Sequence, residues 1–379
     1  MTASRPARIA LLLPRLSRYG GAEGFGWRLA EALAAAGHQV DFICARAEAD
    51  PPPGVRAVTV GRLGPCKWTK LLWFVLAAER ARAKGGYDLA IGLGKCLRQD
   101  VFRQGGGPLA VFWERSVRAW PAGASRALKM LRRRLSPANA IARAVEARQA
   151  RTTPVIVANS FKAREWMLAA HPDLPPDRVR VIFNPPDLAR FAPPEPAARA
   201  AARARLGLAE GQRAVLFAGT NFPLKGLGTC IRALARLPER FRLLVAGGRG
   251  PGRFARLAAD LGVAERVRFL GRVEDMGALY GACDAFALPS FFDACSNAVM
   301  EALACGLRTV SSADNGSSHF LPPEQVLADP ADDAALAAAL LALEAAPPPG
   351  PFVWPADLPE GLRAWEALVD ELLQAKETA

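Results

Sequence analysis

Apolar runs alternate with helix-like stretches along both halves of this chain. In the N-terminal half they predict strands at residues 9–14, 40–44, 55–60, 89–93, 155–157 and 179–183, and helices at 23–36 and 69–84. The C-terminal half repeats the alternation, with strands at 214–218, 242–246, 267–270 and 284–288 and helices at 225–237 and 254–261. Strands separated by such helices predict parallel sheets with helices on both faces, and hence an α/β chain of two doubly wound domains.

The break between the two halves is rich in proline. Asn184-Pro185-Pro186-Asp187 and Pro193-Pro194-Glu195-Pro196 predict an extended connector. A second proline-rich patch at 347–351 precedes a final helix expected over about 358–376. We therefore expect an N-terminal domain over residues 1–186 and a C-terminal domain over 187–356.

Bulk composition limits the class of protein. With 379 residues, 51% hydrophobic and 22% charged, the chain is long enough for two domains with real cores. It contains no apolar run of the roughly 18 residues that a membrane span needs, and the run at 9–14 is too short for a secretion signal. Its seven cysteines are odd in number and form no C-x-x-C pair, which argues against a disulfide framework or a zinc site and fits a reducing cytoplasm.

Positive charge is concentrated in one part of the chain. The net charge is +13, and the segment from Arg98 to Arg151 holds twelve Lys or Arg against three Asp or Glu. Its densest part, 126–134, is compatible with a helix, and an earlier segment, 67–84, interleaves cations with aromatic residues. Together they predict contact with an anionic membrane face or an acidic glycolipid. Solvated arginine-rich helices are the alternative, and no nucleic-acid reader motif is present.

Several common chemistries lack their sequence signature. Neither G-x-G-x-x-G nor G-x-x-x-x-G-K-[ST] occurs in a suitable context, which argues against a dinucleotide oxidoreductase and a P-loop phosphotransferase. The three histidines form no H-E-x-x-H, and no nucleophile elbow is evident. Acyl-transfer and zinc-hydrolase functions are therefore disfavoured.

The most informative stretch is the loop-to-helix junction at 291–306. Asp293 precedes a helix that is expected to begin near Ser296 and to end at Gly306, and Glu301 lies about one turn inside it. Amides at the helix N-terminus can hold an anion. An anion socket with a carboxylate on either side suits a sugar bound to a diphosphate. The alternatives are a surface Asp with a solvated Glu, or a glycosidase pair, which needs both carboxyl groups to face one bond.

This junction resembles the E-x7-E motif of retaining glycosyltransferases of family 4, with Asp293 in place of the first Glu. The resemblance implies that Glu301 binds the nucleotide ribose. It also implies that the donor hexose is held by Asp293 and by the residues that follow it, Ala294, Cys295, Ser296 and Asn297.

Four other segments strengthen the resemblance. Gly219-Thr220-Asn221-Phe222-Pro223-Leu224-Lys225-Gly226 resembles the diphosphate-binding G-R-x-x-x-x-K-G loop, with Lys225 matching and Thr220 in the Arg position, for which Arg249 is a possible substitute. The Gly20-Gly21-Ala22-Glu23 loop implies that Gly20 and Gly21 approach the diphosphate and that Glu23 faces the acceptor. Phe269 to Val273 implies a base contact near Val273. Gly316 to Phe320 is similar to lipopolysaccharide core heptose glucosyltransferases, and in that case Lys95 and Arg103 would bind acceptor phosphates.

The resemblance implies a GT-B fold: two Rossmann-like domains with a cleft between them, the first completed by a C-terminal helix (357–379) and binding the acceptor, the second binding the nucleotide sugar. The implied reaction is retaining transfer of a hexose, with UDP-glucose as the expected donor, to a lipopolysaccharide core or related cell-envelope glycan at the cytoplasmic face of the inner membrane. Lys225 and Asp293 would be catalytic, with no cofactor and no metal. Two rivals stay open: a non-catalytic nucleotide-sugar or glycolipid binder, and a nucleotide-sugar epimerase.

Overall fold

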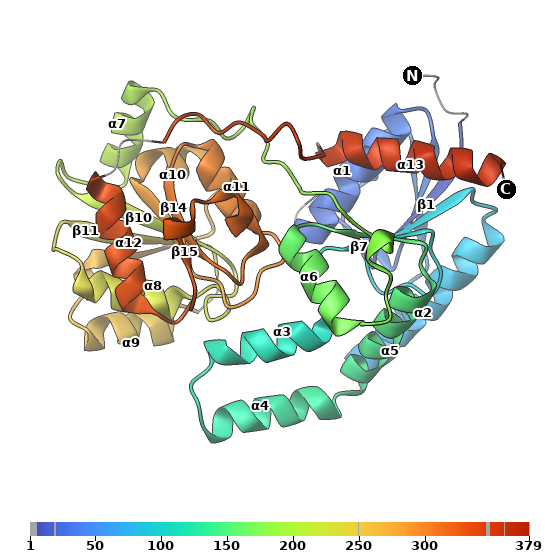
Figure 1. Cartoon of the computed structure of the whole chain (residues 1–379), viewed down its shortest axis with the longest axis horizontal. Coiled ribbons are helices and arrows are strands. Elements are labelled where there is room, and N and C mark those ends of the chain that lie inside the picture. The colour runs from blue at the N-terminus through green and yellow to red at the C-terminus, as the bar shows by residue number, and fades with distance from the viewer. Residues whose placement is uncertain (1–5, 19, 249, 346–348, 360, 379) are drawn as a thin grey trace. The chain divides into compact units, whose positions relative to one another are not determined.

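A computed structural model describes residues 6–18, 20–248, 250–345, 349–359 and 361–378. The chain divides into two compact units. The first unit contains Met1–Trp113, Gly123–Asn184 and Ala356–Ala379, and the second contains Glu114–Ala122 and Pro185–Pro355. The two units are described separately below (Figure 1).

The first unit is built on a seven-stranded sheet in the order β5-β3-β1-β6-β7-β8-β9, and every pairing is parallel. Its strands are β1 (Arg8–Leu12), β3 (Gln39–Cys44), β5 (Val55–Thr59), β6 (Leu89–Gly92), β7 (Val101–Gln104), β8 (Val155–Ala158) and β9 (Val179–Val181). The short strands β2 (Arg15–Leu16) and β4 (Arg46–Ala47) form a separate pair. Its helices are α1 (Gly21–Ala35), α2 (Lys67–Lys84), α3 (Leu109–Ser116), which continues into the second unit, α4 (Ala124–Leu135), α5 (Pro137–Thr152), α6 (Phe161–Ala170) and α13 (Gly361–Glu377).

Alternation along β1 explains why helices cover both faces of this sheet. Ile9 and Leu11 belong to a buried cluster that includes residues of α1 and α13, among them Trp365. Ala10 and Leu12 belong to a second cluster with Phe74 of α2. Successive strand residues point to opposite faces, so an uninterrupted apolar strand needs cover on both sides. Helix α13 supplies part of that cover beside α1 (Figure 1).

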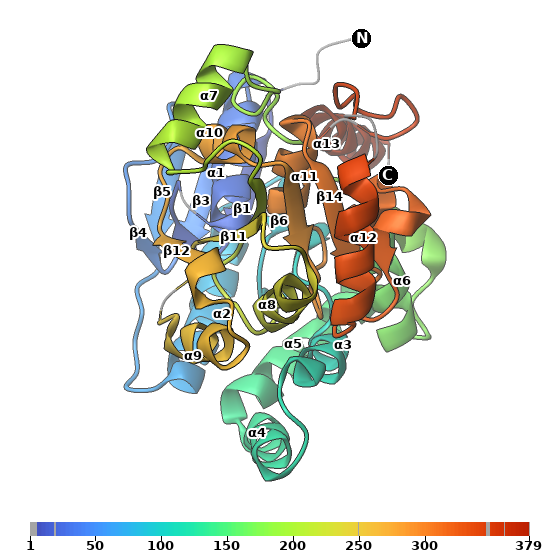
Figure 2. The same cartoon turned by 90° about the vertical axis from the view of Figure 1, so that its left-hand side faces the viewer.

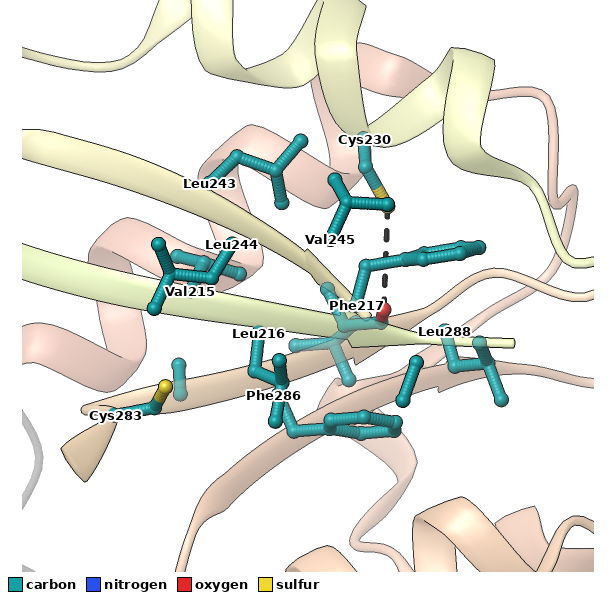
Figure 3. Close-up of a cluster of buried hydrophobic side chains, with 14 of the residues drawn as sticks. Val215, Leu216, Phe217, Cys230, Leu243, Leu244, Val245, Cys283, Phe286 and Leu288 are labelled. Atoms are coloured by element: carbon teal, nitrogen blue, oxygen red, sulfur yellow. Dashed lines mark hydrogen bonds between the residues drawn. The ribbon is translucent and has the colours of Figure 1, made fainter. Parts of the chain in front are cut away.

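The second unit is built on a six-stranded parallel sheet in the order β12-β11-β10-β13-β14-β15. Its strands are β10 (Arg213–Ala218), β11 (Phe241–Ala246), β12 (Val267–Gly271), β13 (Ala285–Leu288), β14 (Arg308–Ser312) and β15 (Val326–Leu327). Its helices are α7 (Pro196–Arg205), α8 (Leu227–Arg236), α9 (Gly252–Asp260), α10 (Met276–Ala282), α11 (Asn297–Ala304) and α12 (Asp333–Ala345). The buried side chains of β10, β11 and β13 interlock at the centre of the sheet, as Figure 3 shows for Phe217, Val245 and Phe286.

Helix α4 lies outside the layered part of the first unit, next to α5 (Figure 1, Figure 2). None of its twelve described residues is buried. Leu128, Leu131 and Leu135 are about half exposed or more, at 47%, 52% and 71%. Among the residues that the structure describes, no helix is both long enough and apolar enough to cross a membrane.

The structure differs from the predicted elements in places where polar residues occupy buried strands. Strand β7 was not predicted because Arg103 and Gln104 interrupt the apolar pattern, although both are buried. Strand β14 was missed for the same reason, since its sequence ends in Ser311-Ser312. The helix predicted from residue 225 begins only at Leu227, because Gly226 adopts a left-handed conformation with φ of 80° and leaves Lys225 in the loop.

Candidate functional site

Two loops of the second unit meet at the carboxyl ends of neighbouring strands. Strands β10 and β13 are adjacent and parallel, so the loop after β10 lies beside the loop after β13. The amide of Phe291 donates to the carbonyl of Leu224 at 2.8 Å. Gly226 packs so closely that a Cβ there would lie 2.1 Å from the Pro289 carbonyl oxygen. This contact explains why glycine is needed at 226 and fixes the loop that carries Lys225.

Lys225 and Asp293 form an ion pair across these loops, between Nζ and Oδ2. Their side chains are 21% and 12% exposed, so the pair is largely shielded but still reachable from solvent. The two side chains predicted to be catalytic therefore lie in direct contact, although they are 68 positions apart in the sequence.

The backbone of Asp293 is held by the loop that follows β14. Its amide donates to the Asp314 carbonyl at 2.9 Å, and its carbonyl accepts from the Gly316 amide at 2.9 Å. These two bonds form an isolated parallel bridge between Asp293 and Asn315. The carboxylate thus projects from backbone that is anchored on both sides.

Helix α11 begins directly after this anchored segment. Ser296 occupies the N-cap position with φ of −82° and ψ of 114°, but no side-chain cap hydrogen bond is made there. Instead, the Ser296 carbonyl accepts from the Ser317 hydroxyl at 2.9 Å, and Cys295 Sγ lies 3.4 Å from that same hydroxyl. With no side-chain cap at its described N-terminus, the first turn of α11 presents amides to an incoming anion. The helix ends before Gly306, which has φ of 71°.

Glu301 on α11 has a buried partner that the sequence did not indicate. The hydroxyl of Tyr280, a residue of α10 with no exposed surface, donates to Glu301 Oε2 at 3.0 Å and lies 3.3 Å from the Ala298 carbonyl. Burial, and after it the negative charge of Glu301, raise the pKa of Tyr280 well above its usual value. Tyr280 therefore remains a hydrogen-bond donor that orients the carboxylate. Nothing in the spacing of Tyr280 pointed to this role.

The remaining predicted donor residues lie on loops at the same ends of the strands. Thr220 is exposed just after β10, and Val273 is half-buried after β12. The loops after β10 and β11 approach closely, since a Cβ on Gly247 would lie 2.6 Å from the Gly219 carbonyl oxygen. Arg249, the possible substitute for the missing arginine, lies outside the described residues.

In the first unit, the predicted Gly20–Glu23 loop is the start of α1, which begins at Gly21. Gly20 has φ of 105° and occupies the N-cap position, and both Gly20 and Gly21 are exposed. Glu23, in the first turn of α1, accepts a hydrogen bond from Arg15 Nη2 at 2.7 Å. The residue before Gly20 lies outside the described part of the chain.

The two cations predicted to bind the acceptor also have partners inside the first unit. Lys95 Nζ donates to Glu146 Oε2 at 2.8 Å, and Glu146 is buried. Arg103 is only 5% exposed, and its guanidinium lies 3.9 Å from the centre of the Phe25 ring. The acceptor-binding roles of Glu23, Lys95 and Arg103 remain predictions.

Models of two known protein families match this chain. Residues 19–190 match the model described as Glycosyltransferase Family 4, and residues 212–345 match the model described as Glycosyl transferases group 1. The two matches together take in most of the chain. The chain thus carries a family-4 glycosyltransferase domain followed by a group-1 glycosyltransferase domain. The predicted family membership is thereby confirmed.

Curated family members match over part of their length. The D-inositol 3-phosphate glycosyltransferase of Mycobacterium sp. (strain KMS) is 37% identical over 169 residues, which cover 42% of this chain and 37% of that protein. The protein of the same name from Salinispora arenicola (strain CNS-205) is 38% identical over 179 residues, covering 42% of this chain and 40% of its own. The chain thus spans about two fifths of the length of these curated relatives.

Solved structures resemble the chain over nearly its whole length. WaaG, a glycosyltransferase involved in lipopolysaccharide biosynthesis, has a TM-score of 0.74 at 23% identity, covering 97% of this chain and 94% of that one. The sucrose-phosphate synthase of Thermosynechococcus elongatus has a TM-score of 0.69 at 23% identity, covering 97% and 94%. Anabaena Alr3699/HepE in complex with UDP and glucose has a TM-score of 0.67 at 20% identity, covering 89% and 90%. The two domains of this chain therefore have the GT-B fold, as predicted.

Proposed function

We propose that this family-4 chain is a retaining glycosyltransferase that transfers a hexose from a nucleotide sugar to a cell-envelope glycan. The observation that carries the proposal is the Lys225–Asp293 ion pair beside the uncapped N-terminus of α11. A cation, a carboxylate and the amides at the start of a helix together suit a diphosphate joined to a polyhydroxylated ring. UDP-glucose is the expected donor and a lipopolysaccharide core the expected acceptor. HepE, in complex with UDP-glucose, and WaaG, involved in lipopolysaccharide biosynthesis, support these choices by shared fold alone.

The donor is proposed to lie along the carboxyl ends of β10 to β13. Glu301, oriented by Tyr280, binds the ribose hydroxyls, and backbone near Val273 faces the base. The diphosphate is met by Lys225, Thr220 and the amides from Ala294 to Asn297. Asp293 binds the hexose hydroxyls. Gly20 and Gly21 are the proposed contribution of the first unit to diphosphate binding.

The proposed chemistry is front-face transfer without a metal. The leaving diphosphate gains negative charge as the glycosidic bond breaks, and a fixed cation aimed at it lowers the barrier. The ion pair between Lys225 and Asp293 is the arrangement before the donor binds. When the donor binds, Lys225 leaves Asp293 to contact the diphosphate, and Asp293 then accepts hydrogen bonds from the sugar hydroxyls. A diphosphate oxygen takes the proton of the acceptor hydroxyl, and the new bond forms on the face that the leaving group vacates.

The first unit is proposed to bind the acceptor and the membrane. Glu23, Lys95 and Arg103 are the proposed acceptor residues, and the latter two must exchange their present partners to bind a phosphate. Helix α2 exposes Trp68, Leu72, Trp73 and Leu76 beside its cations, and α4 exposes leucines among arginines. Such surfaces favour peripheral contact with anionic lipid at the cytoplasmic face of the inner membrane.

The decisive experiment measures UDP release from UDP-sugars with and without a lipopolysaccharide-core acceptor. Acceptor-dependent release of UDP with retained anomeric configuration is expected. A non-catalytic binding protein would release no UDP, and an epimerase would convert the donor sugar without any acceptor. A thermal-shift panel of nucleotide sugars selects the donor beforehand, because a ligand that binds only the folded state raises its stability.

A further inference from the structure

A short segment that lies within the first half of the sequence belongs to the second unit. Residues Glu114–Ala122 comprise the end of α3 and the turn that follows it. Arg118 Nη2 donates to Asp329 Oδ1 at 2.8 Å, and the guanidinium of Arg253 lies 5.1 Å from the centre of the Trp120 ring. An ion pair and a cation–π contact therefore hold this segment within the second unit.

Two arginines of this segment converge on one buried carboxylate. Arg115 Nη1 pairs with Asp314 Oδ1, and Arg118 Nη1 donates to Asp314 Oδ2 at 3.2 Å. The Asp314 side chain is 4% exposed. A buried carboxylate is stable only when charged or polar partners compensate its lost hydration. Arg115 and Arg118 supply such partners, one to each carboxylate oxygen.

Asp314 begins the loop that shapes the proposed hexose site. Its carbonyl accepts from the Asp293 amide at 2.9 Å, and Gly316, two residues on, donates to the Asp293 carbonyl. In the same loop, Ser317 donates to the Ser296 carbonyl at 2.9 Å. The position of Asp293 and the position of the α11 N-cap both depend on where this loop lies.

We propose that Arg115 and Arg118 are positioning residues for the donor hexose, acting through Asp314 on the backbone of Asp293. This inference rests on the proposed function, since it presumes that Asp293 binds sugar hydroxyls. Within the described part of the chain, no hydrogen bond or ion pair joins either arginine to Lys225 or Glu301. Their loss should therefore weaken recognition of the hexose while leaving recognition of the uridine intact.

The second unit contains a matched control for this arrangement. Arg232 and Arg236 of α8 both pair with Asp333, at 3.2 Å and 2.6 Å. That cluster joins α8 to the start of α12. It has the same composition, two arginines on one aspartate, but among the described residues no hydrogen bond connects Asp333 to Asp293 or to residues 314–317.

The experiment compares the full-length double variants R115Q/R118Q and R232Q/R236Q with the wild type. Calorimetry measures the affinity for UDP and for the UDP-hexose that the wild type binds best, and initial rates give kcat and KM for that donor. For R115Q/R118Q we expect UDP affinity within about twofold of the wild type, loss of the extra affinity that the hexose confers, and a kcat reduced by about tenfold or more. The conservative R115K/R118K variant should recover part of the hexose-dependent affinity and part of kcat. For R232Q/R236Q we expect wild-type values.

Each alternative outcome contradicts a definite claim. If R115Q/R118Q matches R232Q/R236Q in hexose-dependent affinity and kcat, the positioning role is wrong while the proposed function stands. Equal losses of UDP and UDP-hexose affinity would also overturn it, because the effect would then not be specific to the sugar. If R115Q/R118Q does not fold, the single variant R118Q is measured by the same criteria. A wild-type chain that binds no nucleotide sugar would overturn the proposed function itself, and the inference with it.

Discussion

The two sheets present very different surroundings to the residues predicted from the sequence. In the second unit, the predicted residues contact one another: Lys225 pairs with Asp293. In the first unit, each predicted polar residue is engaged by a neighbour that was not predicted to bind ligand. Glu23 accepts from Arg15, and Lys95 donates to Glu146. In the second unit, the candidate ligand-binding residues are thus brought together before a ligand arrives. In the first unit, each candidate residue instead has a hydrogen-bond partner with no proposed ligand.

This difference has a physical consequence for specificity. A diphosphate is the same in every nucleotide sugar, so fixed charges and fixed backbone can be prepared for it in advance. When the donor binds, Lys225 and Asp293 exchange each other for groups of the same ligand. An acceptor residue such as Lys95 instead leaves behind a buried partner that has no proposed ligand, which reduces the net affinity it contributes. We therefore expect substitutions in the second unit to change catalysis, and substitutions at the paired residues of the first unit to change acceptor affinity and stability together.

The largest effect is expected for Lys225→Ala. Removal of the only predicted cation of the 219–226 loop should lower kcat by about a hundredfold or more, as for loss of an oxyanion donor. Lys162→Ala is the matched control, because Lys162 is a lysine of the first unit paired with Glu165 at 2.8 Å and has no predicted role. Initial-rate measurements of UDP release decide the matter. A kcat for Lys225→Ala near that of Lys162→Ala would remove Lys225 from its assigned role.

The next effect concerns nucleotide affinity. Glu301→Gln keeps the shape of the side chain but removes its charge, and should weaken UDP binding by about tenfold or more, since a hydrogen bond to a charged group contributes roughly 1.5–3 kcal/mol. Tyr280→Phe removes only the group that orients Glu301 and should weaken UDP binding less. Calorimetry with UDP measures both. Unchanged affinity in Glu301→Gln would contradict the ribose assignment, whatever Tyr280→Phe does.

How far the sequence could predict this arrangement varies with the kind of residue. Strands such as β1 and β10 were recognised because every residue after their first arginine is apolar, and the end of α1 was recognised from Gly37, which has φ of 93°. Strands β7 and β14 were missed, because their buried polar residues are satisfied by tertiary partners that a local pattern does not reveal. For example, Ser311 Oγ donates to the carbonyl of Leu288, on the neighbouring strand β13, at 2.9 Å.

The candidate site shows the same division. Asp293, Glu301 and Lys225 were indicated by short motifs, since each lies within a few positions of a strand end or a helix start. The groups that support them come from distant segments: Tyr280 from α10 and Asp314 from the loop after β14. The sequence offered one signal for the support from Asp314: the turn-forming run at residues 314–318, shortly after strand β14, which was not predicted. Motif spacing therefore identified the candidate ligand-binding residues, and only the tertiary structure identified the groups that support them.

In the first unit, Lys95→Met tests whether the Lys95–Glu146 pair is structural. Glu146 would stay buried with the Leu109 amide, 3.1 Å away, as its main remaining donor. Because the Lys95 side chain is 27% exposed, we expect a loss of only about 1–2 kcal/mol in the free energy of unfolding. The KM for the acceptor should rise as well, because the proposed phosphate contact is lost together with the ion pair. Denaturant titration and acceptor kinetics measure the two quantities, and an unchanged KM would contradict the acceptor-binding role of Lys95 and leave the pair purely structural.

The smallest effect is expected from the pH dependence of stability at the same cluster. Burial is the main cause that lowers the pKa of His171. The positive charges of Lys95 and Arg151 also lower this pKa, whereas the negative charge of Glu146 raises it, and the net shift is downward. The arginine of α5 that lines the adjoining cavity, Arg143, is a further positive charge on this side. The unfolded chain therefore takes up a proton at His171 more readily than the folded chain does.

Stability contributed by neutral His171 is fully present above the unfolded pKa of about 6.5 and declines as the pH falls through that value toward the lower folded pKa. We expect the wild type to lose more free energy of unfolding between pH 7.5 and pH 5.5 than His171→Asn does, as measured by denaturant titration. The opposite order would mean that protonated His171 forms a stabilising ion pair with Glu146, whose Oε1 lies 3.9 Å from Nε2. The first unit would then contain a charge pair that acidification strengthens, and its polar groups would not be fully compensated at neutral pH.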